Sequence, residues 1–178
     1  MRIAYAGHAG AFGELACLAR FPEAAAIGHE DFRAACEALV AGTCDRAVIP
    51  VENSVAGVVP GVADLIGGLP VRRIDTHAQP VAFHCLAPRG TLLDDVEVVA
   101  SHPMGLAECR KFLARIGARA EEAGDTAGAA AEVAQAGARN RAALASTRAA
   151  ELYGLEVIAE HVEDSADNVT FFAVLERA

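Results

Sequence analysis

The chain has little positive charge. Of its 178 residues one is a lysine, Lys111, and 24 acidic residues outnumber 15 basic ones to give a formal net charge of −9. A protein that follows a nucleic acid needs a basic face to neutralise phosphates, and this composition offers none. We therefore expect no nucleic-acid partner. If the substrate is an anion, positive potential must be gathered at one site, from an arginine or from helix N-terminal amides.

Long hydrophobic runs and paired cysteines are also lacking. No apolar stretch has the length of a signal peptide or a membrane span, so we expect neither secretion nor membrane insertion. The five cysteines show no CxxC spacing and lie mostly in apolar or amphipathic runs, where cysteine packs as a small hydrophobic residue. This pattern predicts free thiols in a reducing cytoplasm and no metal site, with the adjacent His84 and Cys85 as the one alternative ligand pair.

What the chain does have is hydrophobic content, 53% of its residues, which excludes a disordered protein. Short apolar runs alternate with helical patterns from end to end, as is typical of an α/β protein with helices packed on a largely parallel sheet. Strands are predicted at 2–6, 25–27, 46–51, 71–75, 82–87, 96–101, 119–121, 142–146, 156–161 and 170–175. Helices are predicted at 12–21, 31–41, 61–66, 103–116, 126–136 and 147–153.

Two polar segments interrupt this alternation, one at residues 73–80 and one at 163–167. Two crossings between two α/β blocks predict one lobe of residues 1–78 plus 164–178 and a second lobe of residues 79–163. A ligand would then lie in the cleft between the lobes. The alternative is a single continuous sheet with two ordinary loops.

Five loop segments follow predicted strands, and such loops gather at the carboxyl ends of strands, where α/β proteins bind ligands. Each also has a purely structural explanation, as a glycine turn, a helix cap or a strand residue. In the last segment a regular strand would place Asn168, Thr170 and Phe172 on one face and Val169 and Phe171 on the other. The segments are 7–14, 50–54, 101–103, 124–127 and 168–172.

The order and spacing of these motifs resemble the catalytic region of prephenate dehydratases over almost the whole chain. The resemblance rests on residues 11–14, on the run 47–57 with Glu52-Asn53-Ser54, and on Ser101-His102-Pro103. It continues through residues 125–127, 149–155 and 162–164 to Asn168 and Thr170. It implies a two-lobed α/β fold similar to type II periplasmic binding proteins, with the active site in the cleft.

The resemblance also implies the chemistry. Prephenate, a dicarboxylate, loses water and carbon dioxide to become phenylpyruvate, and no cofactor or metal is needed because the ring accepts the electrons. Thr170 is expected to assist the leaving hydroxyl as a hydrogen-bond donor. A cytoplasmic homodimer or homotetramer is expected, without a regulatory ACT domain. The residues expected to bind substrate are Gly10, Ala11, Phe12, Asn53, Ser54, Ser101, His102, Asp125, Thr126, Asn168, Phe171 and Phe172.

Three positions depart from the family pattern. Ala11 and Gly13 replace hydroxyl residues of the glycine turn, and Phe171 replaces an arginine that follows the catalytic threonine. An arginine bound to a carboxylate contributes about 1.5–3 kcal/mol. The departures leave two alternatives to dehydration, namely a decarboxylase that retains the ring hydroxyl and a non-catalytic module that binds a small anion. Arogenate is a further possible substrate.

Overall fold

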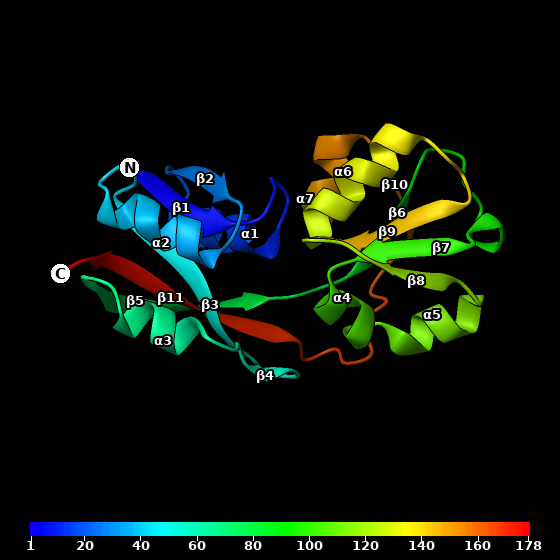
Figure 1. Ribbon diagram of the computed structural model, residues 1–178. Coiled ribbons are helices and arrows are strands. Elements are labelled where there is room, and N and C mark those ends of the chain that lie inside the picture. The colour runs from blue at the N-terminus through cyan, green and yellow to red at the C-terminus, as the bar shows by residue number, and fades with distance from the viewer. The chain divides into compact units, whose positions relative to one another are not determined.

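Two separate β-sheets organise the chain, and the computed structural model describes all 178 residues (Figure 1). The first unit contains Met1–His8, Phe12–Pro80 and Val169–Ala178, and the second contains Ala9–Ala11 and Val81–Asn168. The single-sheet alternative is therefore wrong. The chain passes between the units after residues 8, 11, 80 and 168, so there are four crossings where the sequence predicted two.

The crossings near residues 80 and 168 fall slightly later than the predicted ends at 78 and 163. Pro80 is still paired with Val169 in the sheet of the first unit. The Asp164 amide donates to the Glu108 carbonyl at 2.6 Å, which keeps that segment within the second unit.

The sheet of the first unit has the order β2-β1-β3-β11-β5, and β4 pairs with β3. β1 runs parallel to β2 and β3, whereas β11 lies antiparallel between β3 and β5. The predicted parallel character is thus wrong on this side of the sheet, because the last strand enters from the second unit in the opposite direction. The strands are β1 (Arg2–Ala6), β2 (Ala25–His29), β3 (Arg46–Asn53), β4 (Gly57–Val58), β5 (Val71–Pro80) and β11 (Val169–Arg177).

Helices cover both faces of this sheet. Successive residues of a strand point to opposite faces of the sheet, and residues of β1 contact helices on both faces. Ala4 belongs to one hydrophobic cluster with Cys36 and Leu39 of α2 (Phe32–Val40), whereas Tyr5 meets Gly13 of α1 (Phe12–Arg20). The third helix, α3 (Val62–Gly67), adds Val62 to the same cluster as α2.

The second unit has a sheet of order β10-β6-β9-β7-β8. β7 is parallel to β8 and β9, and β6 is antiparallel to β9 and β10. Figure 1 shows α6 and α7 on one face of this sheet and α4 and α5 on the other. The strands are β6 (His84–Ala87), β7 (Val98–Ser101), β8 (Arg119–Glu122), β9 (Arg141–Ala145) and β10 (Glu156–Ala159). The helices are α4 (Pro103–Glu108), α5 (Arg110–Ile116), α6 (Thr126–Ala136) and α7 (Thr147–Tyr153), with a 3-10 turn, η1, at Leu93–Asp95.

Several predicted elements are confirmed with the same bounds, among them β1, α6 and α7. Two expectations are wrong. Residues 73–80 belong to the ten-residue strand β5 and not to a crossing, and the long helix predicted at 103–116 is two helices that meet at Cys109 (φ −118°, ψ 24°). The apolar spacing of Leu106, Cys109 and Phe112 continues through the break, so periodicity alone does not reveal it.

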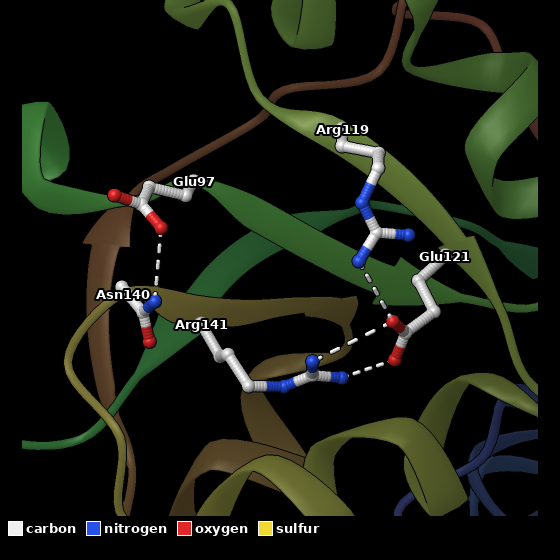
Figure 2. A network of polar contacts seen from close by, with 5 residues as sticks. All are labelled: Glu97, Arg119, Glu121, Asn140 and Arg141. Carbon is white, nitrogen blue, oxygen red and sulfur yellow. Dashed lines mark hydrogen bonds and ion pairs between the residues drawn. The ribbon is translucent and has the colours of Figure 1, made fainter.

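A polar network in the second sheet joins β8 to β9 across β7, which lies between them (Figure 2). Arg119 and Arg141 flank Val98 of β7 in the register, and both guanidinium groups reach Glu121. Hydrogen bonding from Arg141 is the main reason why the pKa of Glu121 is lowered from its usual value. Beside this group, Asn140 donates to Glu97 at 3.0 Å.

The five cysteines are buried free thiols, as predicted. Burial raises the pKa of Cys17 and of Cys85 to about 12, and that of Cys36 to about 11, so these thiols are protonated at neutral pH. A protonated, buried thiol is a poor nucleophile and a poor metal ligand. No helix has both the length and the apolar character needed to cross a membrane.

One carboxyl group in the second unit is buried. Glu108 is 8% exposed, and its Oε2 accepts a 2.5 Å hydrogen bond from Asn168 Nδ2. Burial raises the pKa of Glu108 above its usual value, the Asn168 contact opposes that shift, and nearby Glu163 adds to it. Folding therefore favours the protonated form of this side chain, and ionisation works against the folded state.

Glu108→Gln is expected to make the second unit less sensitive to rising pH. Because the folded pKa lies above the unfolded one, the contribution of Glu108 to stability is present at acidic pH and is lost as pH rises through the folded pKa. Glutamine keeps an oxygen for Asn168 and has no charge. Denaturant unfolding from pH 4 to pH 8 should show the variant gaining on wild type as pH rises. Glu132→Gln, on an exposed position of α6, serves as the control and should follow wild type. A constant difference across this pH range would contradict the account.

Candidate active site

The end of β3 and the start of β11 bring Thr170 against Asn53. The register places Thr170 directly opposite Asn53 on one side and Gln79 of β5 on the other. Asn53 Nδ2 donates to Thr170 Oγ1 at 3.0 Å. Direct cross-strand partners share a face, so the threonine hydroxyl lies in a row between two amide side chains. Two residues predicted as separate members of the site are thus joined.

Gln79 was not among the predicted residues, because its segment was interpreted as a crossing. The sequence carries no apolar alternation there, because Asp75, His77 and Gln79 are all polar; only in the structure do these half-buried residues alternate with exposed ones, as in a strand. Gln79 Nε2 donates to the Pro80 carbonyl at 3.1 Å, and Gln79 Oε1 lies 3.3 Å from His77 Nε2.

Ser54 fixes the start of β11. Its backbone amide donates to the Val169 carbonyl at 2.8 Å, and its hydroxyl accepts from the Val169 amide at 2.9 Å. This reciprocal pair holds Val169, and so positions the next residue, Thr170. Ser54 was predicted to contact substrate, which stays a prediction; its two hydrogen bonds with Val169 give it a structural role.

The predicted alternation along the last strand holds only in part. β11 begins at Val169, so Asn168 lies outside it, and the Asn168 side chain bonds Glu108 in the second unit. Pairing with β3 also shifts by one residue, since Phe171 lies opposite Glu52 and Phe172 opposite Pro50. Phe172 is buried at 3% exposure. Asn168 therefore does not join Thr170 and Phe172 in one row.

Phe171 faces away from Thr170. The two residues are adjacent in a regularly paired stretch, so their side chains project to opposite faces of the sheet. The side chain directly opposite Phe171 on β3 is that of Glu52, which is exposed. An arginine at this position would meet a carboxylate of the same chain before any ligand bound beside Thr170.

The glycine turn is held by α7. Gly10 has a φ of +94°, and a Cβ there would lie 2.8 Å from the Cα of Ala149. Ser146 Oγ donates to the Gly10 carbonyl at 2.6 Å, and the Tyr153 hydroxyl donates to the Ala9 carbonyl at 2.8 Å. Ser146 and Tyr153 were not predicted as site residues. Their side chains bond backbone atoms that are far away in the sequence, and no local sequence pattern indicates hydrogen bonds of this kind.

The turn continues through Ala11, which is buried, into Phe12, the half-buried first residue of α1. The Gly13 departure has a packing explanation. A Cβ at Gly13 would lie 3.2 Å from Tyr5 Cδ2 and 3.4 Å from the Ala6 carbonyl oxygen. The close approach of α1 to β1 leaves no room for a hydroxyl side chain unless Tyr5 gives way.

Ser101 and His102 have well-defined structural contacts. Ser101 is fully buried and its hydroxyl donates to the Leu144 carbonyl at 2.8 Å, so this side chain ties β7 to β9. His102 is the N-cap of α4, and its Nδ1 accepts from the Met104 amide at 3.2 Å. Desolvation by surrounding atoms lowers the pKa of His102, although Asp125 opposes that shift. A neutral ring is the form that can accept this hydrogen bond.

Asp125 and Thr126 begin α6. Asp125 Oδ1 accepts from the amides of Ala127 at 3.0 Å and Gly128 at 2.9 Å, which confirms the predicted cap, and Thr126 is the half-buried first residue of the helix. Two arginines of β5 are occupied at the surface, since Arg72 pairs with Glu176 and Arg73 bonds Thr76. Arg148 forms an ion pair with Glu151 at 3.8 Å and precedes Ala149, which lies against Gly10.

The predicted site residues thus divide between the two units. The first unit holds Phe12, Asn53, Ser54, Thr170, Phe171 and Phe172. The second holds Gly10, Ala11, Ser101, His102, Asp125, Thr126 and Asn168. No group of three or more histidine, cysteine, aspartate or glutamate side chains is arranged to hold a metal ion.

Two β-sheets of mixed strand direction, each covered by helices, define the fold class of periplasmic substrate-binding proteins. The methionine binding protein MetQ matches 99% of this chain and 82% of its own, with a TM-score of 0.52 at 12% identity. At that identity the likeness is one of fold alone.

Closer matches identify the family. The sequence model of the prephenate dehydratase family matches residues 3–178, so the chain belongs to this family. Arogenate dehydratase 3 of Arabidopsis thaliana is 40% identical over 180 residues, covering 99% of this chain and 42% of the relative. Prephenate dehydratase from Arthrobacter aurescens, solved in complex with L-Phe, has a TM-score of 0.90 at 29% identity and covers 100% of this chain and 61% of that one. The chain spans less than half the length of the plant relative.

Gly10→Ala is expected to loosen the glycine turn. The substitution combines a left-handed backbone, which costs about 1–2 kcal/mol with a side chain present, with a clash against Ala149. We expect a loss of about 2 kcal/mol or more in the free energy of unfolding, measured by chemical denaturation.

Two other glycines separate these causes. Gly117→Ala places a side chain at a φ of +68° in open space, and Gly124→Ala places one in open space without that conformation. We expect the first to lose only the backbone part and the second to remain near wild type. Equal losses for Gly10→Ala and Gly117→Ala would show that the contact with Ala149 contributes nothing.

Proposed function

We propose that this chain is a prephenate dehydratase, which converts prephenate to phenylpyruvate in the biosynthesis of phenylalanine. The observation that carries the proposal is the hydroxyl of Thr170 at the start of β11, bonded by Asn53 Nδ2 at 3.0 Å, in a chain of this family. The chain covers only part of its curated relatives, so the activity is inferred for this segment from its residues and its family.

The reaction needs one proton and no external oxidant. The bond between the ring carbon and its carboxylate breaks and carbon dioxide leaves. The electron pair moves through the diene and expels the 4-hydroxyl, which takes up a proton and departs as water. Prephenate dianion and one proton thus give phenylpyruvate monoanion, carbon dioxide and water. Because the electrons stay within the ring as it becomes aromatic, no electron-carrying cofactor is required.

Thr170 would act on the leaving oxygen. A hydroxyl is too weak an acid to drive the step by its pKa, so its contribution is a directed hydrogen bond that stabilises charge as it develops on that oxygen. Charge-assisted hydrogen bonds of this kind are about twice as strong as neutral ones. Preorganisation of the hydroxyl by its neighbours is therefore the property that matters most.

Arogenate and two other activities compete with this proposal. Arogenate carries an amino group where prephenate carries a keto group, and the plant relative is an arogenate dehydratase by name. A decarboxylase would release carbon dioxide and retain the ring hydroxyl, and a binding module would release nothing. Product mass separates all of them, because only dehydration removes the ring oxygen, and dehydration gives phenylalanine from arogenate but phenylpyruvate from prephenate.

The proposal also includes a reducing, cytoplasmic setting and assembly as a homodimer or homotetramer. Five buried free thiols support the first point, since none of them is paired in a disulfide. The second point rests on the family resemblance.

Thr170→Ala is expected to lower kcat for dehydration of prephenate by about a hundredfold to a thousandfold, the range lost when one positioned hydrogen-bond donor is removed. Thr170→Ser, which keeps the hydroxyl, should retain most of the activity. Purified protein is incubated with prephenate or arogenate, phenylpyruvate and phenylalanine are followed by absorbance and mass, and folding of each variant is checked by thermal melting. Absence of product from wild type between pH 6 and pH 9 would overturn the proposal.

Phe171→Arg is expected to change kcat/KM for prephenate by less than about threefold. The new guanidinium would pair with Glu52 on the adjacent strand, away from Thr170, and such an exposed cross-strand pair contributes about 0.2–1 kcal/mol to stability. Unfolding measurements should show this gain, and it should vanish in the double variant Glu52→Gln/Phe171→Arg. A tenfold rise in kcat/KM would instead place the guanidinium on a substrate carboxylate.

A further inference from the structure

The Asn53 side chain can occupy only one orientation. It is 7% exposed, and its Oδ1 accepts from the backbone amides of Val55 and Ala56, both at 2.8 Å. Rotating the amide by 180° would turn its NH₂ group toward two N–H donors, leaving donors facing donors in a buried place. The turn after β3 therefore decides that Nδ2, not Oδ1, faces Thr170.

This orientation determines how the threonine hydroxyl is used. A hydroxyl has one proton to donate and two lone pairs to accept with. Asn53 Nδ2 donates to Thr170 Oγ1 at 3.0 Å, so one lone pair is engaged and the proton must point elsewhere. No hydrogen bond donated by Thr170 to another residue is found, although its neighbours Asn53 and Ser54 are both bonded. The proton remains available to a ligand.

We propose that Asn53 is a positioning residue that keeps the hydroxyl of Thr170 a donor toward the substrate, and that it is not a substrate contact. The inference rests on the proposed dehydratase function. Nδ2 also stabilises negative charge on Oγ1 as the threonine proton moves toward the leaving oxygen. The backbone amides of Val55 and Ala56 thus fix the orientation of the Asn53 amide, and the Asn53 amide fixes the direction in which Thr170 donates.

Asn53→Asp reverses this arrangement with almost no change in shape. One carboxylate oxygen accepts from Val55 and Ala56 as before, so the turn is retained. The other oxygen can only accept, so it takes the proton of Thr170 and removes it from the substrate. When the carboxyl group is protonated it can donate to Oγ1 again, which restores the original direction. A pH-dependent recovery of activity is thus the signature of this role.

The experiment compares kcat for prephenate between pH 5 and pH 9 in wild type and Asn53→Asp. We expect kcat of the variant to fall at least a hundredfold relative to wild type at pH 8, with little change in KM, and to recover toward wild type as pH is lowered. Other titratable groups are present in both proteins, so the ratio of the two profiles reports on position 53. The groups on elements packed against β3 and β11 include Glu14, Glu37, Glu52, Asp64, Asp75 and His77.

Asn140→Asp is the matched control. It adds the same charge at an exposed amide that contacts Glu97 in the second unit (Figure 2), and its profile should follow wild type. Asn53→Ala removes the donor to Thr170 together with the acceptor for the Val55 and Ala56 amides, and it supplies no proton, so its kcat should fall with no recovery at acidic pH. That variant also carries the test if Asn53→Asp fails to fold, as judged by thermal melting.

The outcomes are distinct. No product from wild type overturns the proposed function itself. Product from wild type together with a wild-type kcat in folded Asn53→Asp at pH 8, or in Asn53→Ala, overturns the positioning role. A raised KM with unchanged kcat would make Asn53 a substrate contact and would also overturn it.

Discussion

The insertion of β11 between β3 and β5 is the interaction on which the rest of the first unit depends. The last strand of the chain pairs along its length with β5 and with β3, and Ala173, Val174 and Leu175 are fully buried there. Without β11 the sheet would lack its second-to-last member and Leu175 would be lost from the cluster beneath α2 and α3. The same pairing carries Thr170 to Asn53, 117 residues earlier in the sequence. Stability of the unit and geometry of the site therefore share one cause.

Much of the fold follows from local patterns, because amphipathic periods and caps are properties of short segments. The cap at Asp125 and the proline at the start of α4 place two helix ends correctly. Strand direction and strand partners do not follow, since an apolar run such as 170–175 is compatible with either orientation. β5 was missed over residues 76–80 because it is an edge strand whose half-buried residues there, His77 and Gln79, are polar. The division at Cys109 was missed because the apolar spacing continues across it.

The structure adds contacts between the predicted site residues that the sequence could not supply. Thr170, Asn53 and Ser54 were expected together by resemblance, and their contacts follow from the register of β3 and β11. The support of the glycine turn by Ser146 and Tyr153 spans 136 and 144 residues and leaves no local trace. Two of the residues that depart from the family pattern also have a structural explanation. Gly13 fits the close approach of α1 to Tyr5, and Phe171 faces Glu52, so neither needs to be a lost contact with substrate.

If Asn53 acts only through Thr170, the two residues form one catalytic unit. A double-mutant cycle measures this most directly, with kcat for prephenate determined for wild type, Asn53→Ala, Thr170→Ala and the double variant at one pH. We predict strong non-additivity, in which the double variant is no slower than Thr170→Ala alone, because the amide of Asn53 has no hydroxyl left to position. Losses that multiply, with the double variant slower by the product of the two single effects, would contradict it.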